Sequence, residues 1–299
     1  MQGELILNIN CIMVKLKTAC LIFVLIFSSL VYAQEDLFNE IDTDSVLNKH
    51  VSAVFKGLKI INFESTKLAS KEEFYFVVSH RFGSVKGGFK ELFGLDQAAT
   101  RLNFIYGISN SLNVGFSRSS YQKTYEISLK YRVLQQGLKG GSPVTIVGFN
   151  SISVNTFLDE AFLPELEFND RLSYVSQLLI SRKFSKKLSL ELMPTLVHEN
   201  LVKNSKQDNT QYVMGIGGRC KITKRLSLNC DYGYHLNRDN NSIYKNNLAV
   251  GVDIETGGHV FQLQFSNAQP SFESGYLTKA TGDWGNSEIF FGFNLSRVF

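Results

Sequence analysis

The amino-acid sequence predicts an all-β fold, an antiparallel transmembrane β-barrel of about 12 strands over residues 71–299. Three observations lead to this prediction. Apolar and polar residues alternate over long segments, short and long connections follow one another in turn, and charged residues in mid-segment keep to one face. The composition agrees, because 24 Phe, 12 Tyr and 23 Gly with only 4 Pro are typical of strands and turns.

The chain begins with the pattern of an export signal. Lys15 and Lys17 precede an apolar run, and Val31-Tyr32-Ala33 fits a small-residue cleavage site. We therefore expect residues 1–33 to be a cleaved signal peptide, in which Met13 offers a second start that would make residues 1–12 a spurious extension. The alternative, a membrane anchor, would need about 20 apolar residues, which is more than this run contains.

Residues 34–70 form a segment of a different kind. The first part, Glu35 to Asn48, is polar and acidic and has no strand periodicity. The second part is too apolar for a linker, with Val54, Phe55, Leu58, Ile60, Ile61 and Phe63. We expect a periplasmic segment that packs against the barrel or adds a strand to it.

Alternation then predicts each strand in order. The clearest case is 124–133, where Tyr125 and Ile127 share one face while Glu126 and Ser128 share the other. Such segments exceed the about 5–6 residues usual in soluble sheets and match the about 9–11 residues that cross a bilayer. The predicted strands are 72–82, 99–108, 111–119, 123–134, 143–154, 171–184, 187–198, 210–222, 225–236, 246–255, 258–267 and 287–299.

The connections indicate which end of the barrel faces which side of the membrane. Three short ones, 108–112, 184–188 and 222–226, repeat one pattern of an apolar residue, Ser or Thr, two polar residues and Leu. Outer-membrane barrels have short periplasmic turns and longer external loops. Two connections depart from the alternation, since 135–142 is long for a periplasmic turn and 120–122 is short for an external loop. The long connections are 83–98, 155–170, 199–209, 237–245 and 268–286.

Charged residues distinguish the two faces of the strands. Those on the apolar face lie near strand ends, where a long side chain reaches the headgroups at little cost. A charge in mid-strand facing lipid would cost about 2–4 kcal/mol, so the polar face is predicted to line the lumen. The predicted lumen-facing charged residues are Arg101, Glu126, Lys130, Arg132, Glu191, Arg219 and Asp231. They would form either a path for solute or a salt-bridge network that fills a narrow barrel, and the sequence leaves both open.

The last strand ends the chain on an aromatic residue. Phe291, Phe293 and Leu295 share the apolar face, and Phe299 is the final residue. This ending resembles the C-terminal signal that bacterial outer-membrane barrels present to the barrel-assembly machinery. The resemblance implies that machinery as a partner.

Deletion of Phe299 is therefore expected to impair membrane assembly more than Phe293→Leu does. The deletion removes the terminal residue of the signal, whereas leucine keeps an apolar side chain against lipid. The fraction of protein that migrates faster in unboiled than in boiled gel samples measures assembly. Equal assembly of the two variants would remove the special role of Phe299.

Three further stretches resemble one family in particular. They are Phe55-Lys-Gly-x-x-Ile-Ile-Asn62, Phe93-Gly-Leu-Asp96 and Gly292-Phe-Asn-Leu-Ser-Arg-Val-Phe299. Together they resemble a family of outer-membrane β-barrels of Gram-negative bacteria whose activity is unknown. The resemblance covers residues 50–299 and implies an outer-membrane barrel, and it brings no catalytic or binding residues.

No catalytic or metal-binding motif stands out. The five histidines have no H-E-x-x-H spacing, and no G-x-S-x-G or Walker loop occurs. We predict no enzyme activity, no cofactor and no metal, although His198 followed by Glu199 keeps a hydrolase as a third hypothesis. The net charge of +4 without a basic run gives no support to nucleic-acid binding.

Cys220 and Cys230 flank one predicted turn and point to the same face. If Thr223 opposes Ser227, the two cysteines face each other directly and a disulfide becomes feasible. The interpretation we favour is two small apolar residues that face lipid, and the alternatives are a structural cross-strand bridge and a redox pair.

The leading functional hypothesis is a monomeric outer-membrane barrel, surrounded by outer-membrane lipids, that acts as a narrow pore or transport component for small polar solutes. The alternative is a closed barrel that displays loops 155–170 and 268–286 or anchors a partner. The sequence names no solute.

Overall fold

The computed structural model describes residues 50–51, 54–138, 141–159, 161, 163–202, 207–256 and 259–299. Residues 48–183 and 187–299 form one compact unit, which contains the barrel. The expected signal peptide and the acidic stretch of residues 35–48 lie outside the described residues.

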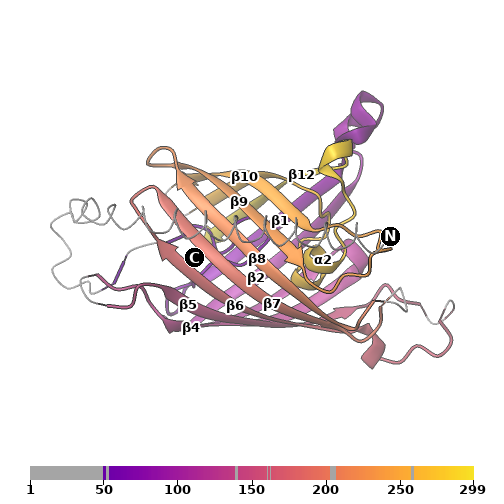
Figure 1. The fold of residues 1–299 in the computed structure, drawn as a ribbon, viewed down its shortest axis with the longest axis horizontal. Helices are drawn as coiled ribbons and strands as arrows, with labels where there is room; N and C mark the ends of the chain where they lie inside the picture. The colour runs from indigo at the N-terminus through magenta and orange to yellow at the C-terminus, as the bar shows by residue number, and fades with distance from the viewer. Residues whose placement is uncertain are drawn as a thin grey trace, which may run out of the picture. The chain divides into compact units, whose positions relative to one another are not determined.

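Twelve antiparallel strands close into a barrel, so the predicted fold class is confirmed (Figure 1). Each strand pairs with its neighbours in sequence, and β1 pairs with β12 to close the ring. The strands are β1 (Phe74–Ser84), β2 (Ala98–Ser109), β3 (Leu112–Ser119), β4 (Thr124–Leu134), β5 (Thr145–Asn155), β6 (Leu172–Lys183), β7 (Leu188–Glu199), β8 (Thr210–Lys221), β9 (Leu226–His235), β10 (Asn247–Thr256), β11 (His259–Ser266) and β12 (Phe290–Val298).

Burial alternates along the strands as the sequence period requires. In β1, every second residue from Tyr75 to Arg81 is buried, while the residues between face outward. The outward residues of the barrel include many large exposed apolar side chains, which suits a surface in contact with lipid. Examples are Leu102, Phe104, Tyr106, Ile127, Leu178, Tyr212 and Leu228.

The connections hold the helical elements. One α-helix, α2 (Glu273–Thr278), lies between β11 and β12, and 3-10 helices span Val85–Gly94, Tyr121–Lys123, Asn169–Arg171 and Trp284–Asn286. Among the described residues, no helix has the length and hydropathy needed to cross a membrane. The long turn after β4 contacts the segment that precedes the barrel, because the Val51 N–H donates to the Gln136 carbonyl at 2.9 Å.

Two segments fill the lumen. The first, residues 54–69, is called the plug here, and the second, residues 267–282 with α2 at its centre, is called the α2 loop. Phe63 of the plug meets Tyr276 of the α2 loop edge to face, with ring centroids 5.2 Å apart. Both side chains have no exposed surface. The barrel therefore has a packed interior at this level, not an open bore.

The inner face of β5 to β8 carries apolar residues that pack against the plug and the α2 loop. This apolar wall consists of Val147, Phe149, Val175, Leu179, Met193, Val197 and Val213. The sequence argument that the polar face lines the lumen accounts for the charges but not for this wall. The reason is that an inward residue next to a plug faces protein, not water.

The structure corrects the expectation that loop 268–286 is displayed outside the barrel for its first part, residues 268–280, whereas residues 281, 285 and 286 are exposed. Glu273 and Tyr276 are 0% exposed, and Leu277 is 2% exposed. Burial of an aromatic and a leucine side chain stabilises a fold by about 1.5–3 kcal/mol each, which favours the folded-in position of this loop.

The structure agrees with the interpretation of Cys220 and Cys230 as unbonded residues on the outer face, not with a disulfide. Cys220 lies opposite Leu228, and Cys230 lies opposite Gly218, so the two are offset by two residues. Both are exposed and free. The strand register causes this offset. Lys221 opposes Ser227, whereas the two cysteines would lie directly opposite each other only if Thr223 opposed Ser227.

Candidate functional site

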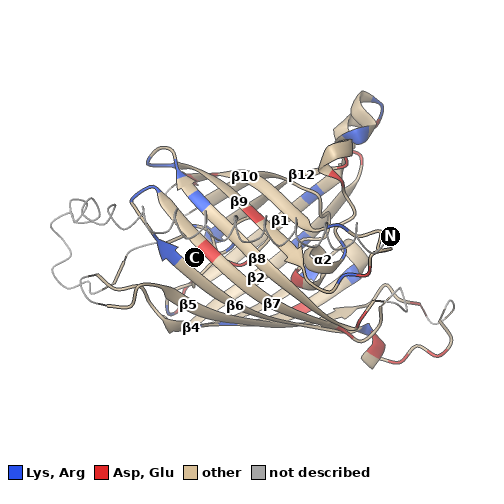
Figure 2. Cartoon of the chain, viewed as in Figure 1, with Lys and Arg blue, Asp and Glu red and all other residues tan. Residues whose placement is uncertain are grey.

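A chain of six charged residues crosses the lumen and joins three parts of the protein. Two lie in the plug (Lys59 and Glu64), one in the α2 loop (Glu273), and three on the wall strands β2 and β4 (Arg101, Glu126 and Lys130). We call this set the buried charge chain. Figure 2 shows charged residues within the strand ribbons as well as in the loops.

Positive and negative groups alternate along the buried charge chain. Lys130 Nζ lies 2.9 Å from Glu64 Oε2, and Glu64 Oε1 lies 3.0 Å from Lys59 Nζ. Lys59 also pairs with Glu273. Glu273 Oε2 is 3.3 Å from Arg101 Nη2, which is 2.5 Å from Glu126 Oε1. Each charge thus has an opposite neighbour, as burial of ions requires.

A carboxylate of β9 holds the plug from the other side. Asp231 Oδ2 accepts hydrogen bonds from the backbone N–H groups of Ile61, Asn62 and Phe63 at 3.0, 2.8 and 3.2 Å. Three converging donors of this kind stabilise a buried anion. Asp231 is 1% exposed, so it fixes the position of the plug backbone.

The plug side chain Asn62 extends this polar contact. Its amide nitrogen donates to Asn247 Oδ1 at 3.0 Å and to Ser266 Oγ at 2.8 Å, and its oxygen accepts from Arg81 Nη2 at 3.3 Å. The Asn294 amide donates to the Ile61 carbonyl at 3.1 Å. The interior of β9 to β12 is thus a polar wall, opposite in character to the apolar wall of β5 to β8.

The remaining predicted lumen charges have local partners. Glu191 accepts from the Thr66 N–H at 3.1 Å, and Arg219 lies 2.9 Å from Glu255 Oε1. Arg132 donates to the Asn110 carbonyl at 3.1 Å, at the turn between β2 and β3. Arg132 therefore lies at the rim, whereas the others are buried.

The residues of the predicted C-terminal signal lie on the outer face of β12. Phe291, Phe293 and Leu295 alternate with buried Gly292 and Asn294. The backbone of Phe299 exchanges two hydrogen bonds with Phe74, at 2.9 and 3.2 Å. The terminal residue thus pairs with the first strand where the barrel closes.

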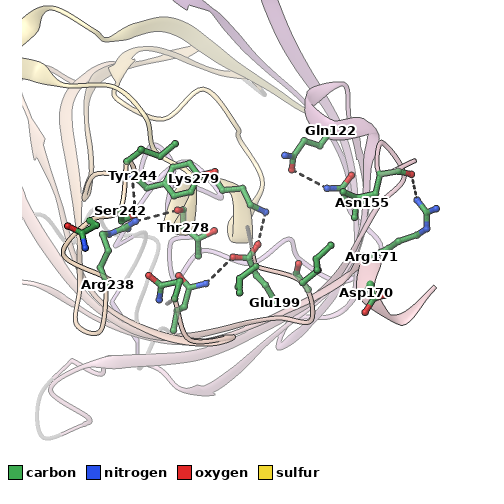
Figure 3. Close-up of a pocket in the computed structure, with 18 residues that line it drawn as sticks. Gln122, Asn155, Asp170, Arg171, Glu199, Arg238, Ser242, Tyr244, Thr278 and Lys279 are labelled. Carbon is green, nitrogen blue, oxygen red and sulfur yellow. Dashed lines mark hydrogen bonds and ion pairs between the residues drawn. The ribbon is translucent and has the colours of Figure 1, made fainter. Parts of the chain in front are cut away.

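A cavity opens at each end of the lumen, with the plug and the α2 loop between them. At the end with the short turns, a cavity of about 300 Å³ is lined by residues that include Lys56, Tyr75 and Glu255. At the end with the long loops, a cavity of about 280 Å³ is lined by residues of four connections and of the α2 loop (Figure 3). We call the latter the mouth pocket.

The mouth pocket is lined by three cationic side chains, Arg171, Arg238 and Lys279, and two carboxylates, Asp170 and Glu199. Lys279 Nζ lies 2.6 Å from Glu199 Oε1. Burial disfavours the charge on Lys279, but Glu199 outweighs this and raises the pKa of Lys279 above its usual range. For Arg238, burial prevails over the attraction of Glu199 and lowers the pKa to about 10.

His198, the residue considered for a hydrolase, contacts a threonine hydroxyl and not a catalytic acid. His198 Nδ1 lies 2.8 Å from Thr210 Oγ1, while the neighbouring Glu199 points to Lys279 and Gln211. No cluster of three potential metal ligands occurs among the described residues. Within that part of the chain, His198 and Glu199 do not form a paired acid and base.

Sequence patterns missed half of the buried charge chain. Lys59, Glu64 and Glu273 lie outside the predicted strands, where alternation gives no information about the direction of a side chain. The apolar character of residues 54–63 was the only signal that this stretch is buried.

Comparisons with known proteins agree with the barrel. Residues 55–299 match the family model described as a membrane bound beta barrel domain (DUF5777). No curated protein matches the chain.

Several solved structures of membrane channels are similar at low identity. The NanC porin gives a TM-score of 0.46 at 10% identity, covering 75% of this chain and 98% of that one. The KdgM porin gives 0.46 at 10% identity, covering 76% and 99%. An outer membrane channel from Pseudomonas putida F1 gives 0.43 at 13% identity, covering 78% and 97%.

Proposed function

Because the chain belongs to the family of membrane-bound β-barrel domains (DUF5777), as its sequence motifs predicted, we propose that it is an outer-membrane barrel that acts as a gated, narrow pathway for small polar solutes. In this proposal the structure represents the closed state, and the plug is the gate.

The unequal attachment of the plug is the observation that carries this proposal. Toward β5 to β8, the plug buries Phe55, Ile60 and Phe63 against the apolar wall. Toward β9 to β12, it makes hydrogen bonds to Asp231, Asn247 and other polar groups. Water can replace a hydrogen bond at a net cost of about 0.5–1.5 kcal/mol, but exposure of one large apolar side chain costs about 1.5–3 kcal/mol.

The pathway is therefore expected to open along the polar wall while the plug stays docked on the apolar wall. A route on that side would run between the two end cavities past Asp231, Gln262 and Asn294, which offer hydrogen bonds to a hydrated solute. The mixed charges of the interior suit uncharged or weakly charged small solutes.

Asn62→Ala is expected to raise the open probability of single channels in planar bilayers by about 5- to 100-fold, because it removes polar contacts worth about 1–3 kcal/mol from the closed state alone. Asn200→Ala is the matched control. Its amide donates to the Asn169 carbonyl in an exposed loop and has no contact with the plug.

A second candidate, the permanently closed barrel, is favoured by the apolar wall. Inward apolar side chains such as Val147, Leu179 and Met193 would be exposed to water in an open lumen. They stabilise a plug that stays in place. If neither the wild type nor Asn62→Ala shows conductance above the background of protein-free bilayers, the gated pathway is wrong and the closed barrel stands.

A further inference from the structure

We infer that the mouth pocket is a binding site for a small hydroxylated monocarboxylate, with Arg238 as the group that binds the carboxylate. This inference does not depend on conductance, because a closed barrel with this pocket would bind the same ligand.

Arg238 is the cationic side chain of the pocket whose hydrogen bonds are weakest. Its Nη1 and Nη2 atoms donate to the carbonyl oxygens of Thr278 and Leu277, both at 3.4 Å, and its Nε atom has no partner. No carboxylate of the described residues lies within ion-pair distance of its guanidinium. By contrast, Lys279 is already paired with Glu199.

The Nε atom of Arg238 is buried, but Nη1 and Nη2 each keep one N–H that these bonds do not use. Such a planar guanidinium matches a carboxylate, which can accept two parallel hydrogen bonds from it. The lowered pKa of Arg238 has the same origin, because burial without a paired anion disfavours its charge. A bound carboxylate would supply that anion.

The two carboxylates of the lining restrict the ligand to a single negative charge. Asp170 and Glu199 give the described lining a balance of three positive and two negative groups. One added negative charge neutralises the described lining, whereas a dianion such as phosphate would leave an excess of negative charge beside Glu199.

The rest of the lining selects hydroxyl groups. Gln122, Asn155, Ser242 and Tyr244 line the pocket (Figure 3). The Asn155 amide donates to Gln122 Oε1 at 3.3 Å, and Ser242 Oγ accepts from the Tyr244 N–H at 3.2 Å. Among the described residues, the Tyr244 hydroxyl has no hydrogen-bond partner. The volume of about 280 Å³ is close to the lower end of the range of roughly 300–1,000 Å³ for small-ligand pockets.

Isothermal titration of the detergent-solubilised full-length chain with sodium gluconate tests the site. Glucitol is the matched neutral probe, because it differs from gluconate only in a CH₂OH group in place of the carboxylate. Saturable binding of gluconate, with at least tenfold weaker binding of glucitol and of inorganic phosphate, is the expected result.

Arg238→Gln is expected to weaken gluconate binding by about 10- to 100-fold, the equivalent of a lost charge-assisted hydrogen bond. Arg118→Gln is the control for loss of one arginine. Arg118 lies on the outer face, with its Cζ atom 5.5 Å from the centroid of the Tyr125 ring. This variant should bind gluconate as the wild type does. Faster migration of unboiled samples checks that each variant is a folded barrel.

Tyr244→Phe provides a second test if Arg238→Gln fails to fold, since it removes one hydroxyl and should weaken gluconate binding severalfold. Equal binding of gluconate and glucitol, no saturation by gluconate, or wild-type affinity in both folded variants would overturn the inference. Tighter binding of phosphate than of gluconate would also overturn the assigned ligand class.

Discussion

Replacement of Glu273 by glutamine is expected to lower the free energy of unfolding by about 3–5 kcal/mol, the largest effect of any single charge substitution in the lumen. Glu273 is fully buried between Lys59 and Arg101, so its loss leaves three cations and two carboxylates in the buried charge chain. Denaturant titration in detergent, followed by the fluorescence of the single tryptophan, Trp284, measures the change.

Glu288→Gln is the matched control for this prediction. Glu288 pairs with Lys86 at 2.5 Å, but both side chains are partly exposed, at 35% and 58%. Exposed ion pairs contribute about 0–1 kcal/mol, so the denaturation midpoint should move little. Equal destabilisation by the two substitutions would show that the buried charge chain is not held as a network.

Phe63→Ala is expected to lower the free energy of unfolding by about 3–5 kcal/mol through loss of apolar contact and creation of a cavity. The ring has no exposed surface. Cβ atoms added to Gly215 and Gly233 would lie 2.8 and 2.9 Å from it, so the two glycines make room for the ring between β8 and β9.

Phe89→Ala is the control, since Phe89 is 86% exposed in the loop after β1. It should leave the denaturation midpoint within about 0.5 kcal/mol of the wild type. If Phe63→Ala were as stable as Phe89→Ala, residues 54–69 would not form a tightly packed plug, and the gate assigned to them would lose its basis.

The strands could be predicted because a barrel repeats one local rule. A wall between lipid and an interior forces alternation with period two, and β4 shows it from Tyr125 to Val133. Each predicted strand occurs with its ends displaced by about three residues or fewer. The family resemblance, carried by motifs near both ends of the barrel, is confirmed as well.

The candidate site could be predicted only in part. Alternation placed Arg101, Glu126 and Lys130 on one face, but no local pattern indicates that Lys59 and Glu273 lie between them. Glu273 and Lys59 are 214 positions apart, and the energy that joins them arises only after the barrel has closed. The same holds for Arg238 and Thr278 in the mouth pocket.

Hydrophobic periodicity along single segments was enough to predict the barrel, its strand number and the outward face of each strand. The filled lumen, the apolar wall on the inner face of β5 to β8, and the contacts of Asp231 and Glu273 with the plug became known only from the folded chain. The physical reason is that an inward side chain has the same period whether it meets water, a solute or a plug. What it meets depends on segments far away in the chain.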